Sequence, residues 1–217
     1  MKLKKSYLII LNGEILDNQI IKHFKNRNLY TICADGSIDK VRKLIPDFVP
    51  HFVIGDFDSI SKKSMEIDNV KYFHATNKNF TDGEKSIVYA LTNGATEIDI
   101  IGFGGNRLDH TLNHLFLLKK YESQSDIRMW DQCDTILYRS SSFNLKVKPE
   151  NRISFIPFFE KTVFGTCKGL EYTCDNITLH EQPSISNKTT SGEISVEIKE
   201  GSVLVVVSHN GFFYFSD

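Results

Sequence analysis

The chain has 217 residues, with 26 lysines and arginines against 27 aspartates and glutamates, a formal net charge of -1 and 41% hydrophobic residues. This length and hydrophobic fraction exclude an intrinsically disordered chain and allow one large domain or two small ones, each with a buried core. The balanced charge excludes a generally basic surface for nucleic acid, and no apolar run approaches the roughly 20 residues that cross a bilayer.

The N-terminal residues predict a β-strand rather than a targeting segment. Lysines at positions 2, 4 and 5 precede the apolar run 7–11, which ends at the turn signal Asn12-Gly13. This run is too short for a secretory signal. The four cysteines form no CxxC pair and no zinc-ligand spacing, a pattern typical of reduced thiols. We therefore expect a cytoplasmic protein without a membrane segment and without a nucleic-acid partner.

Over roughly the first 130 residues, short apolar runs alternate with helical patterns. The expected strands are 7–11, 31–34, 52–55, 70–74, 98–101 and 127–130. The expected helices are 15–24, 38–45, 81–91 and 108–118, and the third begins with a capping-box pair, Thr81 and Glu84. The strands lack polar alternation, which is typical of strands buried on both faces. This alternation of strand and helix predicts a Rossmann-like parallel α/β sheet.

After about residue 140 the pattern changes to short β-branched or aromatic segments separated by Gly, Pro, Asn or Ser. The expected strands are 151–157, 162–166, 176–179, 194–198, 202–207 and the Phe-rich end 212–215, and no helical period appears among them. This pattern predicts an all-β module, either a sandwich or a small barrel. We place the boundary at the serines 140–142, which gives an α/β domain over residues 1–141 and a β-sandwich domain over residues 142–217.

Polar segments follow three of the expected N-terminal strands. They are Asp35-Gly36, Gly55-Asp56-Phe57-Asp58-Ser59, and the glycine-rich run 102–105 that leads into Asn106-Arg107-Leu108-Asp109-His110. In an open parallel sheet the carboxyl ends of all strands lie on one edge, and ligands bind in the crevice there. The three segments are therefore expected to converge on one site.

Asp56 and Asp58 are two residues apart, so in extended backbone their side chains project to the same face. Two carboxylates held together repel each other, and one takes up a proton unless a cation neutralises them. Oxygen ligands suit Mg2+ or another hard cation. The alternative is turn chemistry, because aspartate readily caps turns and helices. Because Asp35 follows a neighbouring strand, we give metal binding and turn capping about equal weight.

Other charged residues near these segments have both a structural and a functional interpretation. Asp82 follows Thr81 at a helix start, where a carboxylate complements the helix dipole and also stays ionised, as a metal ligand must. Arg107 follows a glycine-rich turn, and its planar fork suits phosphate oxygens. Lys78 and Lys85 could supply further positive charge to a phosphate, or could be solvated surface charges.

Several common site patterns are absent from the sequence. The chain has no GxxxxGK(S/T) and no GxGxxG, which excludes a Walker-type P-loop. His110 and His114 are four residues apart, a spacing that can ligate zinc, but no HExxH and no third ligand accompany them. His110 is instead expected to orient its neighbours through hydrogen bonds. The residues alone predict a magnesium-dependent site for a phosphorylated ligand and leave the acceptor open.

Four motifs occur in a recognisable order along the chain. They are Cys33-Ala34-Asp35-Gly36, Ile54-Gly55-Asp56-Phe57-Asp58-Ser59, Lys78-x-x-Thr81-Asp82 and Gly105-x-Arg107-Leu108-Asp109-His110-Thr111. They resemble the successive motifs of the thiamine pyrophosphokinase family. Three segments of the C-terminal half also resemble the family. Ser154-Phe155-Ile156-Pro157 resembles a strand of the family, and Gly169-Leu170-Glu171-Tyr172 resembles its GLxW segment. Ser184-Ile185-Ser186-Asn187 resembles its SxSN turn. The resemblance spans nearly the whole chain, and the second and fourth motifs are highly specific.

This resemblance implies an N-terminal α/β catalytic domain, a C-terminal β-sandwich and a homodimer with active sites at the subunit interface. It implies transfer of the pyrophosphoryl group from ATP to the hydroxyethyl oxygen of thiamine, giving thiamine diphosphate and AMP. The partners are then two small-molecule substrates, and Mg2+ is the implied cofactor.

The resemblance also implies a role for individual residues. The implied Mg2+ ligands are Asp35, Asp56, Asp58 and Asp82. The implied catalytic residues are Asp56, Asp58, Asp82, Arg107 and Asp109, of which Arg107 and Asp109 would order the triphosphate and the metal. The implied ATP-binding residues are Asp35, Gly36, Ser59, Lys78, Thr81, Gly105, Arg107 and His110. Thiamine would be bound by Tyr172, Ser186 and Asn187, and either Asp82 or Asp56 would accept the hydroxyl proton.

Three positions depart from the family pattern. Ser37 stands where glycine is usual, Asn79 where aspartate follows the motif lysine, and Tyr172 where tryptophan is typical. An amide cannot carry charge, so Asn79 is expected to contribute less to metal binding, whereas Tyr172 keeps an aromatic face for stacking. Two alternatives stay open: a DxD-type phosphotransferase or glycosyltransferase with a nucleotide diphosphate donor, and a nucleotide or thiamine sensor that lacks turnover.

Overall fold

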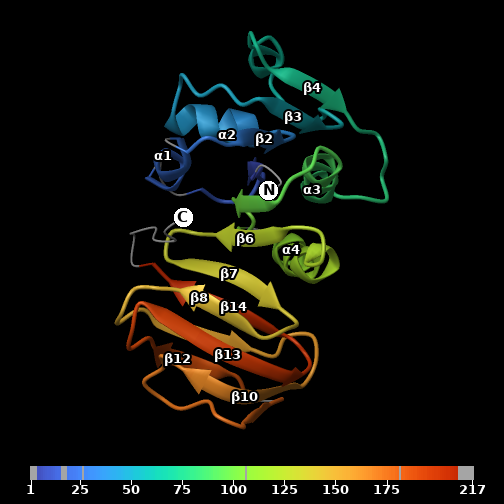
Figure 1. Cartoon of the computed structure of the whole chain (residues 1–217). Coiled ribbons are helices and arrows are strands. Elements are labelled where there is room, and N and C mark those ends of the chain that lie inside the picture. Colours follow the sequence, from blue (N-terminus) through green and yellow to red (C-terminus); the bar gives the residue numbers. More distant parts are fainter. Residues whose placement is uncertain (1–3, 16–18, 26, 106, 181, 210–217) are drawn as a thin grey trace. The chain divides into compact units, whose positions relative to one another are not determined.

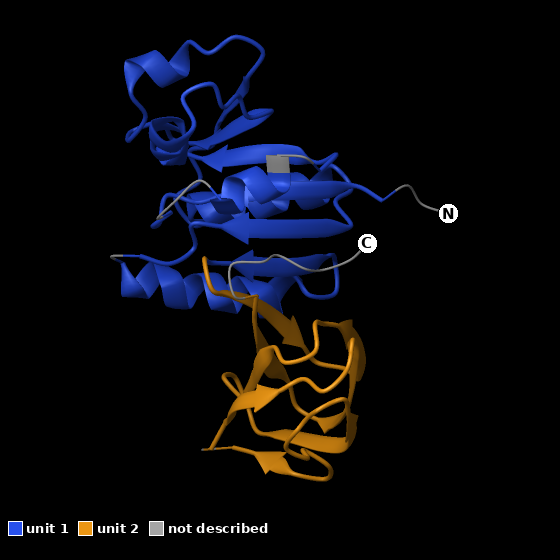
Figure 2. Ribbon diagram, turned by 90° about the vertical axis from the view of Figure 1, so that its left-hand side faces the viewer, with its two compact units in different colours: residues 1–131 blue, residues 132–217 orange. Residues whose placement is uncertain are grey.

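The computed structural model describes residues 4–15, 19–25, 27–105, 107–180 and 182–209. Contacts divide the chain into two compact units, residues 1–131 and residues 132–217, which Figures 1 and 2 show. Part of the expected helix 15–24 and the whole expected strand 212–215 lie outside the described residues. In the described part of the chain, no helix is both long and apolar enough to cross a membrane.

The described residues of the first unit form six parallel strands, as the sequence predicts. The strands are β1 (Ser6–Ile10), β2 (Tyr30–Ala34), β3 (Phe52–Gly55), β4 (Lys71–His74), β5 (Glu97–Ile101) and β6 (Asp126–Trp130). The helices are α1 (Gln19–Lys25), α2 (Ser37–Leu44), α3 (Asp82–Thr92) and α4 (Leu108–Tyr121), with a short 3-10 turn at Lys62–Met65. The strand order is β6-β5-β1-β2-β3-β4, and every pair is parallel.

The central strands are β-branched because both of their faces are covered. Ile9 of β1 pairs with Ile32 of β2 on one side and with Ile100 of β5 on the other. All three side chains are fully buried. Helices cover both faces of such a sheet, which is why these strands read as continuous apolar runs.

The direction in which the sheet grows reverses at β1. The chain builds outward from β1 to β4 and then returns to add β5 on the opposite side of β1. In Figure 1, α1 and α2 lie on one side of this sheet, and α3 and α4 lie on the other. The connections that leave β1 and β5 therefore lead to helices on opposite faces of the sheet, and such a switch point leaves a crevice at the carboxyl ends of the strands.

The described residues of the second unit form two antiparallel sheets around one core. The strands are β7 (Asp134–Arg139), β8 (Phe143–Lys146), β9 (Arg152–Ile156), β10 (Thr162–Lys168), β11 (Thr178–Leu179), β12 (Ser184–Lys188), β13 (Glu193–Glu200) and β14 (Val203–Ser208). One set pairs in the order β12-β9-β14-β7 and the other in the order β11-β10-β13-β8. Phe155 and Val205 of the first set pack in the same core as Phe164 and Ile194 of the second.

The serines 140–142 lie in the connection between β7 and β8, inside the second unit. The sequence predicted neither of these two strands. Phe143–Lys146 is short and alternates half-buried with exposed residues, so it carries little of the apolar pattern that marks the other strands.

Candidate active site

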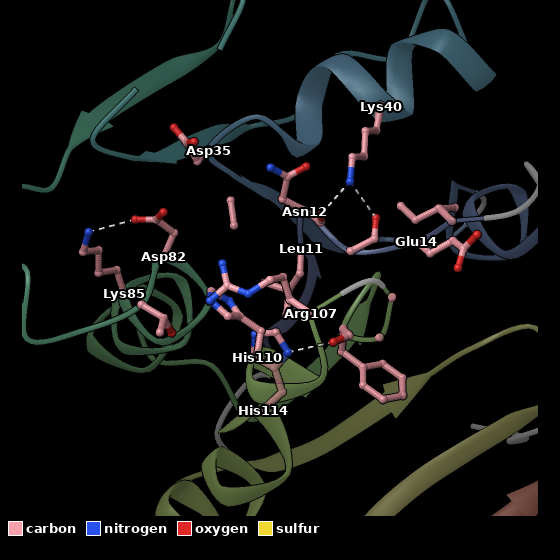
Figure 3. A pocket seen from close by; sticks show the side chains of 18 of the residues that line it. Leu11, Asn12, Glu14, Asp35, Lys40, Asp82, Lys85, Arg107, His110 and His114 are labelled. Carbon is pink, nitrogen blue, oxygen red and sulfur yellow. Dashed lines mark hydrogen bonds and ion pairs between the residues drawn. The ribbon is translucent and has the colours of Figure 1, made fainter. Parts of the chain in front are cut away.

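A cavity of about 850 Å³ opens at the carboxyl ends of the parallel strands, and every residue that lines it belongs to the first unit. Its walls are the loops after β1, β2, β3 and β5 and the first turns of α3 and α4. Figure 3 shows Lys40 and Asn12 on one wall and Asp82 and Lys85 on another. It also shows Arg107, just before α4, close to His110 and His114 on that helix. The cavity therefore occupies the crevice that the reversal at β1 creates.

Three carboxylates meet beside this cavity. One oxygen from each of Asp35, Asp56 and Asp58 lies within 4.8 Å of the others. Asp35 is buried, Asp56 is half-buried and Asp58 is exposed, so the cluster runs from the protein interior to solvent. Asp35 and Asp56 line the cavity, whereas Asp58 does not. The predicted convergence of the segments after β2 and β3 is confirmed.

Asp35 is held by the loop that follows β3. Its backbone takes a left-handed conformation with φ 46°, which aspartate tolerates better than most residues. Its Oδ1 accepts the backbone N–H of Phe57 at 3.0 Å, and its Oδ2 accepts the hydroxyl of Ser59. A Cβ on Gly55 would lie 2.8 Å from the Asp35 Cβ, so the two strand ends can approach this closely only because residue 55 is glycine.

The segment from Asp56 to Asp58 is not extended, so the geometry expected for this pair is wrong. Phe57 has φ 66°, a left-handed conformation that is costly for a bulky residue. The hydrogen bond from Phe57 N–H to Asp35 compensates for that conformation. The two side chains reach the same place through this tight turn, and the Asp58 N–H donates to Asp56 Oδ1 at 3.4 Å. Turn chemistry and carboxylate clustering thus occur in the same segment.

The clustered charges raise the pKa of Asp58. Its pKa lies above the usual value, chiefly because of the charge of Asp56, with partial desolvation and the charges of Asp35 and Asp82 adding to the effect. A cation among these oxygens would remove that repulsion. Carboxylate oxygens at this spacing are the ligands that a hard divalent cation such as Mg2+ prefers, so the three side chains fit such an ion.

Positive charge lines the rest of the cavity. Lysines and an arginine reach it from α2, from the segment before α3, from α3 itself and from the loop before α4: Lys40, Lys43, Lys78, Lys85 and Arg107. The Lys85 ammonium lies 2.8 Å from Asp82 Oδ1 in the first turn of α3. Phosphate oxygens would find both ammonium and guanidinium partners here.

Arg107 and Asp109 form an exposed pair at the start of α4. Arg107 Nε donates to Asp109 Oδ1 at 2.9 Å, and a second guanidinium nitrogen donates to Oδ2 at 2.6 Å. This pairing holds the pKa of Asp109 well below its usual range and raises the pKa of Arg107. Arg107 lines the cavity and Asp109 does not, so Asp109 orients the guanidinium in this structure.

The loop after β1 is a part of the site that the sequence did not indicate. Gly13 N–H donates to Gly102 O at 2.9 Å, and Glu14 N–H donates to Gly104 O at 2.7 Å. These backbone hydrogen bonds join the loop after β1 to the loop after β5. A Cβ on Gly13 would lie 2.1 Å from Gly104 O. The Lys40 ammonium donates to Gly13 O at 3.1 Å and braces the loop from α2. The position of Asn12-Gly13 at the end of a parallel strand was the available signal.

Other expected ATP-site residues have structural partners. Gly36 N–H donates to Ser59 Oγ at 3.2 Å, which ties the loop after β2 to the loop after β3. Thr81 caps α3 by accepting the Glu84 N–H at 3.3 Å, which confirms the expected start signal of this helix. The carboxylate of Glu84, the other member of the expected capping box, accepts a hydrogen bond from the Tyr121 hydroxyl at 2.7 Å.

The remaining positions singled out in the first unit are Gly105, His110 and Asn79. Gly105 and His110 both line the cavity. Asn79 is exposed, donates its N–H to Asn77 Oδ1 at 2.9 Å and does not line the cavity.

The residues expected to bind thiamine lie close together in the second unit. Tyr172 is 64% exposed, whereas Asn187 is 2% exposed. The Asn187 amide accepts the Tyr172 N–H at 3.1 Å and donates to the Tyr172 carbonyl at 2.8 Å, so it clamps the backbone of the tyrosine. Ser186 is exposed and donates its N–H to Ser154 Oγ at 3.0 Å.

The expected turn at 184–187 is wrong, because these residues form β12. Ser184 pairs with Phe155 and Asn187 pairs with Ile153, and the register shifts between the two pairs. The left-handed backbone of Ser186, with φ 60°, absorbs that shift. The segment is therefore a strand with one irregular position, at Ser186.

Comparisons with known proteins agree on one family. The catalytic domain of thiamin pyrophosphokinase matches residues 21–130. Thiamin pyrophosphokinase 1 of Caenorhabditis elegans is 27% identical over 94% of this chain and 90% of its own length. Thiamine pyrophosphokinase of Bacillus subtilis is 30% identical over 79% of this chain and 85% of its own length.

The fold is also that of a solved member of this family. The crystal structure of thiamine pyrophosphokinase from Bacillus subtilis superimposes with a TM-score of 0.81 at 24% identity, covering 94% of this chain and 99% of that chain. The matched catalytic region contains the acidic cluster, the cavity loops from β2 to β5 and the start of α4. The chain belongs to the thiamin pyrophosphokinase family.

Proposed function

We propose that this protein transfers the pyrophosphoryl group of ATP to the hydroxyethyl oxygen of thiamine, giving thiamine diphosphate and AMP. One observation carries the chemistry: three carboxylates meet at the rim of a cavity whose other walls carry lysines and an arginine. That combination suits a metal-bound triphosphate, because its oxygens can be shared between a cation and positively charged side chains. The family membership supplies the substrates.

Asp35, Asp56 and Asp58 would hold Mg2+. Asp82 lies in the cavity wall, acts on the charge of Asp58 and would complete the ligand set. When bound, the ion would neutralise charge on the triphosphate and on the departing AMP. The buried, hydrogen-bonded Asp35 fixes the inner end of the cluster, while the exposed Asp58 leaves the outer end open to a ligand.

The other cavity residues would bind and orient the triphosphate. Arg107, Lys78 and Lys85 would donate to its oxygens, and the first turn of α3 would add the positive end of its helix dipole. The thiamine hydroxyl oxygen would form a bond to the β-phosphorus as the bond from that phosphorus to the AMP oxygen breaks. Either Asp56 or Asp82 would accept the hydroxyl proton. Catalysis of this kind is mainly positioning and charge neutralisation.

We assign the thiamine-binding role to the C-terminal domain, a β-sandwich, and the nucleotide-binding role to the N-terminal domain, which is Rossmann-like. Exposed Tyr172 and Ser186 would contact thiamine, and the hydrogen bonds from Asn187 hold the backbone of the tyrosine in place. A cytoplasmic homodimer with active sites at its interface completes the proposal. Exposed apolar residues at i, i+4 and i+8 on α4, Leu108, Leu112 and Phe116, support a protein partner beside the cavity.

The decisive experiment incubates the purified protein with ATP, Mg2+ and thiamine and separates nucleotides and thiamine esters by chromatography. Thiamine diphosphate appearing in step with AMP, and neither product in the presence of a chelator, is the expected result. ADP with thiamine monophosphate would show ordinary single-phosphoryl transfer instead. Binding of both ligands without any product would show a sensor and overturn the proposal.

A further inference from the structure

His114 is a buried polar side chain in the cavity wall that has no role in the chemistry described above. It lies within α4 and is 7% exposed. It lines the cavity together with Phe103 from the loop after β5 and Gly83 from the first turn of α3, and Figure 3 shows it on the α4 wall. A polar group this deeply buried is expected to use both of its ring nitrogens.

One ring nitrogen has a partner that fixes the position of the proton. His114 Nδ1 lies 2.8 Å from the backbone oxygen of Phe103. A carbonyl oxygen can only accept, so Nδ1 carries the hydrogen and donates it. Burial lowers the pKa of the ring below its usual value and outweighs the hydrogen bond to Phe103, which raises it, and the nearby His110 adds to the lowering, so the ring is neutral near pH 7. In a neutral ring protonated at Nδ1, Nε2 is a hydrogen-bond acceptor.

The second nitrogen lies beside the first turn of α3, in the wall of the cavity. A Cβ on residue 83 would lie 3.3 Å from His114 Nε2 and 3.2 Å from Leu11 Cδ2, so a side chain there would crowd this atom, and Gly83 avoids that contact. Within the described residues, no donor bonds to Nε2. The cavity wall therefore presents a neutral acceptor, held in place by the Phe103 carbonyl and still in need of a donor.

The chemistry of this acceptor selects the part of the ligand that it can contact. The phosphate oxygens of a Mg-bound triphosphate are hydrogen-bond acceptors at neutral pH, so they offer Nε2 no hydrogen. The hydroxyls of a ribose and the amino group of a nucleobase are donors. We propose that His114 determines nucleotide specificity, with Nε2 accepting a hydrogen bond from a hydroxyl or amino donor in the nucleoside part of the bound nucleotide. This inference rests on the proposed function, which places ATP in the cavity.

The test measures the affinity for Mg-ATP by calorimetry in the absence of thiamine, in the wild type and in His114→Asn. Asparagine can keep a donor toward the Phe103 carbonyl but has no acceptor at the position of Nε2. Loss of one hydrogen bond should weaken ATP binding about tenfold. Three analogues then locate the donor: 2′-deoxy-ATP, 3′-deoxy-ATP and an ATP that lacks the exocyclic amino group.

The analogue that lacks the donor should bind about tenfold more weakly than ATP in the wild type, and about equally in His114→Asn. His114→Gln, whose amide oxygen extends toward the position of Nε2, should recover part of the discrimination. His114→Leu should bind ATP no better than His114→Asn and should also melt at a lower temperature, because it leaves the Phe103 carbonyl unpaired. Comparing these variants separates two roles of His114: accepting a hydrogen bond at Nε2, and supporting the loop after β5 through the bond to the Phe103 carbonyl.

Two results would overturn the inference in distinguishable ways. If the wild type binds ATP and all three analogues equally, Nε2 contacts no donor of the nucleoside, and the proposed function still stands. If the wild type binds no Mg-ATP at all, the proposed function fails and takes this inference with it. The wild-type measurements alone decide both outcomes, so the inference stays testable even if a variant does not fold.

Discussion

Asp56 occupies the middle of the acidic cluster, half-buried between Asp35 and the exposed Asp58. We expect Asp56→Asn to lower kcat/KM by at least about 100-fold, because a neutral amide removes one charged metal ligand from the site. The amide oxygen can still accept the Asp58 N–H, so the thermal midpoint should stay within a few degrees of the wild type. Initial rates of AMP release and a thermal melt measure the two effects.

The matched control for this variant is Asp68→Asn, which removes an exposed carboxylate in the turn before β4 that does not line the cavity. It should keep the wild-type rate. Near-wild-type activity in Asp56→Asn would remove this residue from the metal site.

The buried ring of His114 should also make stability depend on pH. Its pKa in the folded protein lies below the ordinary value of 6.5, because burial disfavours the charged ring. The folded protein therefore takes up the proton less readily than the unfolded chain, and the stabilisation present above pH 6.5 is lost as the pH falls. His110 on the same helix lowers the pKa of the ring further, and the hydrogen bond to the Phe103 carbonyl opposes the effect of burial without outweighing it.

The measurement for this effect is urea unfolding of the wild type and His114→Asn at about pH 7.5 and about pH 5. The free energy of unfolding of the wild type should fall more steeply toward low pH than that of the variant. The burial of His51 also lowers its pKa, but this contribution occurs in both proteins and cancels in the difference. Parallel profiles would show that His114 titrates normally.

At this scale the sequence predicted which residues meet, but not how their backbones allow it. Asp35, Asp56 and Asp58 could be brought together from their positions after two neighbouring strands. The left-handed turn at Phe57 could not be foreseen, because it depends on a hydrogen bond to Asp35, which is distant in the sequence. Lys40 escaped notice for a similar reason: only the folded sheet brings α2 beside the loop after β1.

The loops after β1 and β5 act as one element, since backbone hydrogen bonds join them at Gly13 and Glu14. We expect Gly13→Ala to destabilise the protein by about 2 kcal/mol or more, because the new Cβ would lie 2.1 Å from the Gly104 oxygen and force the loops apart. The separation should also weaken nucleotide binding. Denaturant unfolding and the calorimetric affinity for Mg-ATP report the two effects.

Gly104→Ala is the control within the same pair of loops. Nothing lies within 4 Å of a Cβ at that position, so its unfolding free energy should stay within about 0.5 kcal/mol of the wild type. Equal destabilisation by the two alanines would mean that the close approach at Gly13 does not hold the loops together.

Elements with strong periodicity were predictable and those with weak patterns were not. The strands β1, β2 and β3 contain continuous runs of buried apolar residues, and α3 has a cap at Thr81, so their positions follow from local sequence. The pairing of β12 with β9 overrides the turn-like residues Ser184 to Asn187. Strand pairing is a tertiary interaction, and such interactions decide the structure of short polar segments.

Nucleotide binding should be confined to one of the two units. The cavity and the acidic cluster lie entirely within residues 1–131. Mg-ATP at about 100 times its Kd should stabilise the unit that binds it by about 2.7 kcal/mol. Hydrogen exchange measured with and without Mg-ATP should therefore slow in the loops after β1, β2, β3 and β5, and the strands from β8 to β13 should show little change.

Tyr172→Ala provides the complementary measurement in the second unit. It should raise the KM for thiamine and leave the calorimetric affinity for Mg-ATP unchanged, because the tyrosine does not line the nucleotide cavity. Uniform protection of both units by Mg-ATP, or a loss of ATP affinity in this variant, would contradict the assignment of separate roles.

The reversal of strand order at β1 also has a consequence during translation. β1 is the first strand of the sheet to be synthesised, but its second edge pairs with β5, Glu97–Ile101, which is made much later. At about 5–20 residues per second, the nascent chain carries an apolar strand with one open row of N–H and C=O groups for several seconds. Until β5 arrives, a neighbouring nascent chain or a chaperone can occupy that edge. The reversal of strand order that opens the crevice thus also leaves one edge of β1 unpaired while the chain is being synthesised.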